Sequence, residues 1–75
     1  MRKRSIAIKG HRTSIALEEA FWNVLESAAR AEGRSLADLV AEIDRKRLGE
    51  TPQPGLASAL RVYALTRALT VGDKA

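Results

Sequence analysis

The chain has 75 residues, a formal net charge of +4 and no cysteine. A chain of this length forms one domain at most, and a lone copy buries little surface. Disulfide bonds are excluded, and a single histidine, His11, argues against a zinc site. We therefore expect no metal or other cofactor, and we expect a second copy of the chain to supply additional core.

The excess positive charge lies at the amino-terminal end. Residues 1–12 contain no acid and five basic side chains, namely Arg2, Lys3, Arg4, Lys9 and Arg12. The other residues contain eight basic and nine acidic side chains. This asymmetry favours a polyanionic partner, either nucleic acid or an anionic membrane surface. The alternative is a solvated tail that aids solubility.

The basic start does not resemble an export signal. The apolar run after it covers only residues 6–8 and ends at Lys9. A signal peptide needs a longer apolar run, and a membrane span needs a much longer one. We expect a soluble, cytoplasmic protein with no membrane partner.

Residues 12–17 alternate with a period of two. One side of this segment carries Thr13, Ile15 and Leu17. The other side carries Arg12, Ser14 and Ala16. The alternation and the β-branched residues predict a half-buried strand.

Upstream of this strand, Ile6 and Ile8 have the opposite parity, and Gly10 lies between the two runs. One regular strand cannot place both apolar sets on the same face. The chain must bend, bulge or turn near Gly10, or else its start forms a flexible arm. The sequence leaves these alternatives open, and the provisional assignment is a basic arm over residues 1–11.

A first helix is predicted directly after the strand. Glu18 and Glu19 suit the positive end of a helix dipole, and Phe21, Leu25 and Ala28 form an apolar stripe. A glycine at position 33 is expected to end this helix, because glycine readily adopts the left-handed conformation found just past a helix end.

A second helix is predicted from Ser35, which has an acid, Asp38, three residues later in a capping-box-like arrangement. Its apolar positions are Leu36, Leu39, Val40 and Ile43. The core of strand and two helices spans residues 12–48, and residues 49–55 form a linker with two prolines. A third helix is predicted over residues 56–71, with apolar residues on more than one face. We find no internal repeat.

The predicted fold is mainly α with one β-strand per chain. A single strand leaves its backbone donors and acceptors unpaired, at a cost of roughly 1–3 kcal/mol for each buried group. The same strand from a second copy, paired antiparallel about a two-fold axis, satisfies these groups. We therefore predict an intertwined homodimer with a two-stranded ribbon above the helices. The major groove of B-DNA is wide enough to admit such a ribbon.

Residues 12–47 resemble the ribbon-helix-helix DNA-binding regulators of the Arc and MetJ type. The resemblance rests on the segment Arg-Thr-Ser-Ile-Ala-Leu at 12–17 leading into a helix, and on Glu-Gly-Arg-Ser-Leu at 32–36 as the turn into the next. The whole chain is also similar to a bacterial subfamily with this fold. The third helix is additional to the minimal fold and is expected to enlarge a dimer or tetramer interface.

The resemblance implies that the outward strand residues Arg12, Ser14 and Ala16 face base edges. Arginine binds guanine in a fork, serine donates or accepts a hydrogen bond, and alanine touches a thymine methyl group. It also implies that the start of the second helix holds a DNA phosphate. The expected phosphate contacts there are Ser35 and the backbone amides of Leu36 and Ala37. Those nearer the amino terminus are Arg2, Lys3, Arg4, Lys9 and His11.

The leading functional hypothesis is a repressor or autoregulator that binds double-stranded DNA as a homodimer, or as a tetramer assembled on DNA. The first alternative is the antitoxin of a toxin–antitoxin pair, in which the same dimer also binds a toxin protein. The apolar, helical carboxyl end counts against this alternative. The second alternative is an interaction module that does not bind DNA. No nucleophile motif or phosphate-binding glycine loop is present, so an enzyme is not expected.

Overall fold

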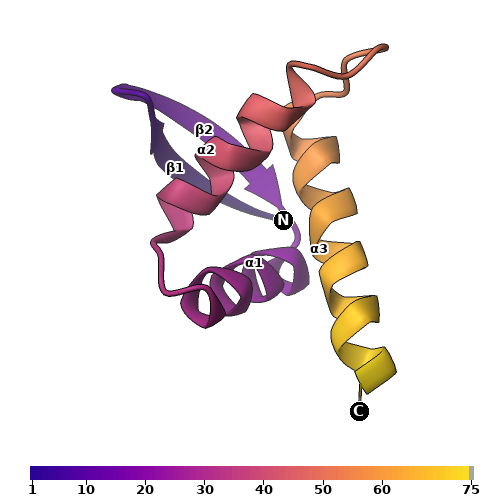
Figure 1. The fold of residues 1–75 in the computed structure, drawn as a ribbon. Helices are drawn as coiled ribbons and strands as arrows, with labels where there is room; N and C mark the ends of the chain where they lie inside the picture. Colours follow the sequence, from indigo (N-terminus) through magenta and orange to yellow (C-terminus); the bar gives the residue numbers. More distant parts are fainter. Residues whose placement is uncertain (75) are drawn as a thin grey trace.

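The computed structural model describes residues 1–74, with side-chain environments through residue 70. Two strands and three helices follow one another in the order β1 (Arg2–Ile8), β2 (His11–Leu17), α1 (Glu19–Ala31), α2 (Leu36–Arg47) and α3 (Leu56–Lys74). Figure 1 shows α2 crossing one face of the β1–β2 hairpin, while α3 runs past α1 and α2. A two-stranded antiparallel ribbon, the two predicted helices and the third helix are therefore confirmed, although both strands of the ribbon belong to one chain.

The number of strands per chain differs from the prediction. β1 and β2 pair antiparallel within one chain, from Arg2 opposite Leu17 to Ile8 opposite His11. The expectation of a single strand was wrong, and residues 2–8 form a strand where an arm was expected. The strand-pairing argument for an intertwined dimer consequently no longer applies, because β2 already has a partner strand in its own chain.

A two-residue turn at Lys9 and Gly10 reverses the chain. Both residues have positive φ angles, 50° at Lys9 and 81° at Gly10. Turns of this handedness match the twist of the flanking strands, and glycine adopts the conformation without steric strain. The turn decides among the alternatives that the sequence left open.

The hairpin also resolves the conflict in parity. Facing residues in its register have opposite parity, so Ile6 and Ile8 lie on the same face as Ile15 and Leu17. All four side chains are buried against the helices. The apolar sets that one straight strand could not place together therefore form one inner face.

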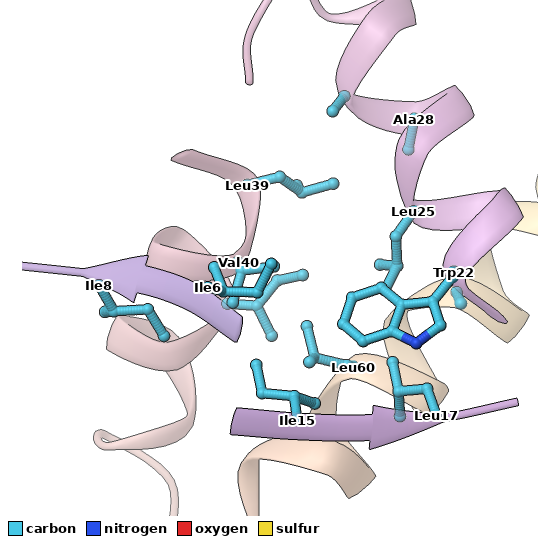
Figure 2. Close-up of a cluster of buried hydrophobic side chains, with 13 residues drawn as sticks. Ile6, Ile8, Ile15, Leu17, Trp22, Leu25, Ala28, Leu39, Val40 and Leu60 are labelled. Carbon is cyan, nitrogen blue, oxygen red and sulfur yellow. The ribbon is translucent and has the colours of Figure 1, made fainter. Parts of the chain in front are cut away.

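The core contains side chains from all five elements (Figure 2). Trp22 and Leu25 of α1, Val40 of α2 and Leu60 of α3 are fully buried. The buried face of α1 is rotated slightly from the predicted apolar stripe. Phe21 is only half-buried, whereas Trp22 is fully buried. The full set of buried apolar residues is Ile6, Ile8, Ile15, Leu17, Trp22, Leu25, Ala28, Ala29, Leu39, Val40, Ile43, Leu60 and Ala64.

The turn between α1 and α2 has the hydrogen bonds of a Schellman motif. Gly33 has a φ of 68°, its N–H donates to the carbonyl of Arg30, and the N–H of Arg34 donates to the carbonyl of Ala29. Ser35 then caps α2, because its Oγ accepts from the backbone N–H of Asp38 at 3.0 Å. These local bonds place the amino terminus of α2 beside the end of α1.

One face of α3 is open to solvent. Leu60 and Ala64 are buried, whereas Val62, Leu65 and Leu69 are 61%, 56% and 60% exposed. α3 therefore closes the core with one face and presents an apolar stripe on another. Within residues 1–74, none of the helices combines the length and apolar character that spanning a bilayer requires.

Candidate nucleic-acid interface

The outer face of the ribbon consists of the side chains that point away from the helices. Three come from β1, namely Lys3, Ser5 and Ala7. Three come from β2, namely Arg12, Ser14 and Ala16. All are exposed except Ala16, which is half-buried. The predicted base-contacting residues of β2 therefore lie together on one exposed surface.

Two basic side chains of the outer face are free of carboxylates. Among the described residues, neither Lys3 nor Arg12 forms an ion pair, and the nearest polar contact of Arg12 is the Ser5 hydroxyl at 3.5 Å from its Nη1. An exposed, unneutralised cation among small side chains can approach a base edge or a phosphate. The outer face therefore carries the positive charge that is needed to bind a polyanion.

Arg2 and Arg4 lie on the other side of the ribbon, above α1. Arg2 pairs with Glu19 at 3.0 Å, and Arg4 pairs with Glu26. The guanidinium of Arg4 also lies 5.0 Å from the centre of the Trp22 ring, a cation–π geometry. Either arginine would have to leave its carboxylate to reach a DNA phosphate.

The other two amino-terminal candidates lie at the tip of the hairpin. Lys9 belongs to the turn and His11 begins β2, and both are exposed. Lys9 has no carboxylate partner within residues 1–74. The tip therefore extends the positive charge of the outer face beyond Arg12.

The start of α2 lies beside a shallow hollow of about 320 Å³. Ser35 is exposed there, while Leu36 and Ala37 are half-buried. The first amides of a helix have no partner within the helix and suit an anion. The hollow is lined by Arg4, Glu26, Ala29, Arg30, Arg34 and Leu36. Three arginines therefore line the hollow together with Leu36, and two of them already pair with glutamates.

Most basic side chains after the ribbon are neutralised. Arg61 of α3 pairs with Glu18 at 3.0 Å, and Arg67 pairs with Glu32 at 2.8 Å. The hydrogen bonds from these arginines lower the pKa of both carboxyl groups. On α2, the hydrogen bond from Arg34 is the main cause that lowers the pKa of Glu42. The structure therefore concentrates the unneutralised positive charge on the hairpin.

The outer face also contains Ser5 and Ala7, which the sequence pattern was not expected to place there, and Lys3, for which only a phosphate contact was expected. The available signal was a short internal repeat, so the expectation that the chain has no repeat was wrong. The strand at 2–8 reads Arg-Lys-Arg-Ser-Ile-Ala-Ile, and nine positions later the chain reads His-Arg-Thr-Ser-Ile-Ala-Leu. Because residues 12–17 are predicted to form a strand, the matching residues 3–8 are expected to form a strand as well.

A family model described as a ribbon-helix-helix domain matches residues 1–68. No curated protein and no solved structure matches the chain. The matched residues include the hairpin, α1, α2 and most of α3. In the described part of the chain, no cluster of acids and histidine is arranged to hold a metal ion. The chain belongs to the ribbon-helix-helix domain family, a family of DNA-binding regulators that generally bind DNA as dimers.

Proposed function

We propose that the protein is a sequence-selective transcriptional regulator, a repressor or autoregulator, that inserts its ribbon into the major groove of DNA. The observation that carries the proposal is the outer face of the ribbon. Its cations Lys3 and Arg12 are exposed and have no carboxylate partner among the described residues, and the side chains between them are small. Because DNA is the proposed ligand, we infer that the protein acts in the cytoplasm.

Arg12, Ser14 and Ala16 are the proposed base contacts. The guanidinium of Arg12 can donate to both O6 and N7 of a guanine. Ser14 can hydrogen-bond either kind of base edge, and Ala16 offers only a methyl group for a thymine methyl. Arg12 therefore carries most of the expected selectivity of β2.

Phosphate contacts are proposed at two places beside the ribbon. At the start of α2, Ser35 and the amides of Leu36 and Ala37 adjoin a hollow with several arginines. At the tip of the hairpin, Lys9 and His11 are exposed. The proposed phosphate contacts also include Lys3, Arg2 and Arg4. To bind phosphate, Arg2 and Arg4 would leave their present partners, Glu19 and Glu26.

We further propose that the protein acts as a homodimer, joined through the open face of α3. Val62, Leu65 and Leu69 are spaced so that they form one stripe, as at helix–helix interfaces. A largely apolar hollow of about 520 Å³ also lies between α1 and α3, and its lining includes Val24, Ala31 and Ala68. Two chains joined through the stripe would carry two ribbons and suit an inverted repeat. Pairing of dimers on DNA would give a tetramer.

The antitoxin remains the second candidate because the same open face of α3 could bind a toxin. A second copy of the chain and a toxin, as alternative partners of this face, predict different oligomeric states for the isolated protein. Sedimentation equilibrium of the isolated chain is expected to show a dimer, and Leu65→Glu is expected to convert it to a monomer. A wild-type chain that is monomeric at all accessible concentrations would exclude the dimer and favour a different protein as the occupant.

The DNA-binding proposal is tested by titration of the wild type and two variants on a selected site and on scrambled DNA, at several salt concentrations. Arg12→Ala is expected to weaken cognate binding by roughly 1–3 kcal/mol per ribbon and to relax preference at one position. Arg45→Ala is the matched control, because Arg45 is an exposed cation of α2 without an ion pair among the described residues. It is expected to leave the preference unchanged.

The salt dependence tests the phosphate contacts. Replacing Lys9, the proposed phosphate contact at the tip of the hairpin, with asparagine is expected to flatten the log–log salt slope by about 0.9 if one contact is lost. If the wild type shows no salt-sensitive DNA binding at moderate salt, the regulator hypothesis fails. The interaction module, with a protein or membrane partner for the basic hairpin, would then be favoured.

A further inference from the structure

The two strands of the ribbon are copies of one pattern. Residues 5–7 and residues 14–16 both read Ser-Ile-Ala. Each of these triplets has a basic residue two positions before its serine, Lys3 in β1 and Arg12 in β2. On the outer face, the order basic, serine, alanine is therefore repeated in both strands.

The register of the hairpin agrees with this repeat. Ser5 faces Ser14, Lys3 faces Ala16, and Ala7 faces Arg12. A two-fold axis through the serine pair exchanges the two strands and places each residue on its counterpart nine positions away. A register shifted in either direction would break this correspondence. One chain therefore builds a ribbon with approximate two-fold symmetry.

This symmetry places Lys3 and Arg12 at opposite ends of the outer face. Their positions are four residues apart along the strand direction, which corresponds to about 13 Å at the rise of an antiparallel strand. That length is close to the rise of about four base pairs. The ribbon expected from the family resemblance would obtain the same symmetry from two identical strands of two chains. Here both strands come from one chain.

We propose that the hairpin of a single chain reads both halves of a short, nearly palindromic DNA sequence. Lys3, Ser5 and Ala7 contact bases in one half, as Arg12, Ser14 and Ala16 do in the other. The proposal rests on the proposed DNA-binding function and names three further specificity-determining residues. It changes the role of Lys3 from a phosphate contact to a base contact.

The placement of the neighbouring cations supports this change of role. Arg2 and Arg4 flank Lys3 in the sequence but pair with Glu19 and Glu26 on the inner side. Lys3 alone of the three lies on the outer face, in line with Ser5. A groove that admits Arg12 to a base edge therefore also receives Lys3 from the paired strand.

The test is a selection of preferred binding sequences by the full-length wild type, Lys3→Ala, Arg12→Ala and Arg45→Ala. Each ribbon variant is expected to lose discrimination at one base pair in the site of each ribbon, by at least about fivefold. Within the site of one ribbon, the positions relaxed by Lys3→Ala and Arg12→Ala are expected to be related by the centre of that site and to lie about four base pairs apart. The control Arg45→Ala is expected to relax none. Circular dichroism confirms that each variant folds.

A gain-of-symmetry variant provides a second measurement. Lys3→Arg gives both strands the same outer pattern of arginine, serine and alanine, because it replaces the flexible ammonium of lysine with the planar guanidinium that Arg12 already presents. Its selected sequence is expected to be a closer palindrome than that of the wild type, with matching bases at the two related positions. An unchanged selected sequence would contradict the proposal.

The failure of this inference is distinguishable from the failure of the proposed function. If the wild type binds no DNA, the function itself is wrong. If the wild type binds and Arg12→Ala relaxes one position, but Lys3→Ala weakens cognate and scrambled DNA equally, then Lys3 contacts phosphate. The regulator function would then stand, and the reading of both halves by one chain would be overturned.

Discussion

The indole N–H of Trp22 donates a hydrogen bond to the backbone carbonyl oxygen of Arg2, with 2.9 Å between the two heavy atoms. Trp22 is fully buried in α1, whereas Arg2 begins β1. This bond therefore ties the start of the ribbon to the first helix. Because Trp22 is the only tryptophan in the chain, its fluorescence reports on this junction.

We expect Trp22→Phe to lower the free energy of unfolding by about 1–2 kcal/mol. The phenyl ring keeps most of the packing but cannot donate the hydrogen bond to Arg2. Trp22→Ala removes the packing as well and is expected to cost about 3–5 kcal/mol. Urea unfolding followed by circular dichroism measures both values. Equal stability of the wild type and Trp22→Phe would show that this bond contributes nothing.

The turn of the hairpin makes a prediction about Gly10. Gly10→Ala is expected to destabilise the fold by about 1 kcal/mol, because a φ of 81° is strained for alanine even though no atom lies near the added Cβ. Lys9→Asn is expected to stabilise the fold slightly, because asparagine followed by glycine favours this turn. Thermal unfolding measures both effects. A flexible arm at residues 1–9 would show no response to either substitution.

The core makes a prediction about the helix faces. Leu25→Ala and Val40→Ala are each expected to cost about 2–4 kcal/mol, because both side chains are fully buried. Val62→Ala is the control, since Val62 is 61% exposed and is expected to have little effect when measured in dilute solution. Denaturant titrations compare the three. Losses under about 0.5 kcal/mol at both buried positions would mean that the core differs from the one described.

Acid is expected to destabilise the fold through the ion pairs of α3. The hydrogen bonds from Arg61 and Arg67 hold the pKa values of Glu18 and Glu32 below the ordinary value of 4.5. A carboxyl group with a depressed pKa stabilises the fold above its unfolded pKa, and this contribution is lost as the pH falls through its folded pKa. The free energy of unfolding should therefore decline as the pH falls below about 4.5.

The decline should be small and weaker at high salt, because both pairs are exposed. The double variant Glu18→Gln, Glu32→Gln is expected to flatten this pH dependence. Glu50→Gln is the control, because Glu50 is exposed and has no basic partner among the described residues. Unfolding curves from neutral to acid pH provide the measurement. A double variant with the same pH dependence as the wild type would contradict the assignment.

Several features could be predicted from the sequence because they depend on local physics. The alternation at 12–17 indicates the strand, Gly33 and Ser35 mark the turn between the helices, and apolar spacing identifies the buried faces. Each of these signals acts within a few residues of the chain. The family resemblance adds an expectation for the role of the outward strand residues, and the family itself is confirmed.

Which strand pairs with β2 could not be predicted from the sequence, because it is decided by the tertiary structure. Parity alone shows that the chain must change direction near Gly10, but bend, bulge, turn and arm all satisfy that condition. The pairing of β1 with β2 decides for the turn, since it buries Ile6 and Ile8 and pairs one backbone edge of β2 within the same chain. Alternation along β1 places Lys3 on the face opposite Arg2 and Arg4, and the packing of the hairpin decides which of these faces is the outer one. Which face of a strand each cation occupies depends on what the strand packs against, and sequence order alone does not determine that.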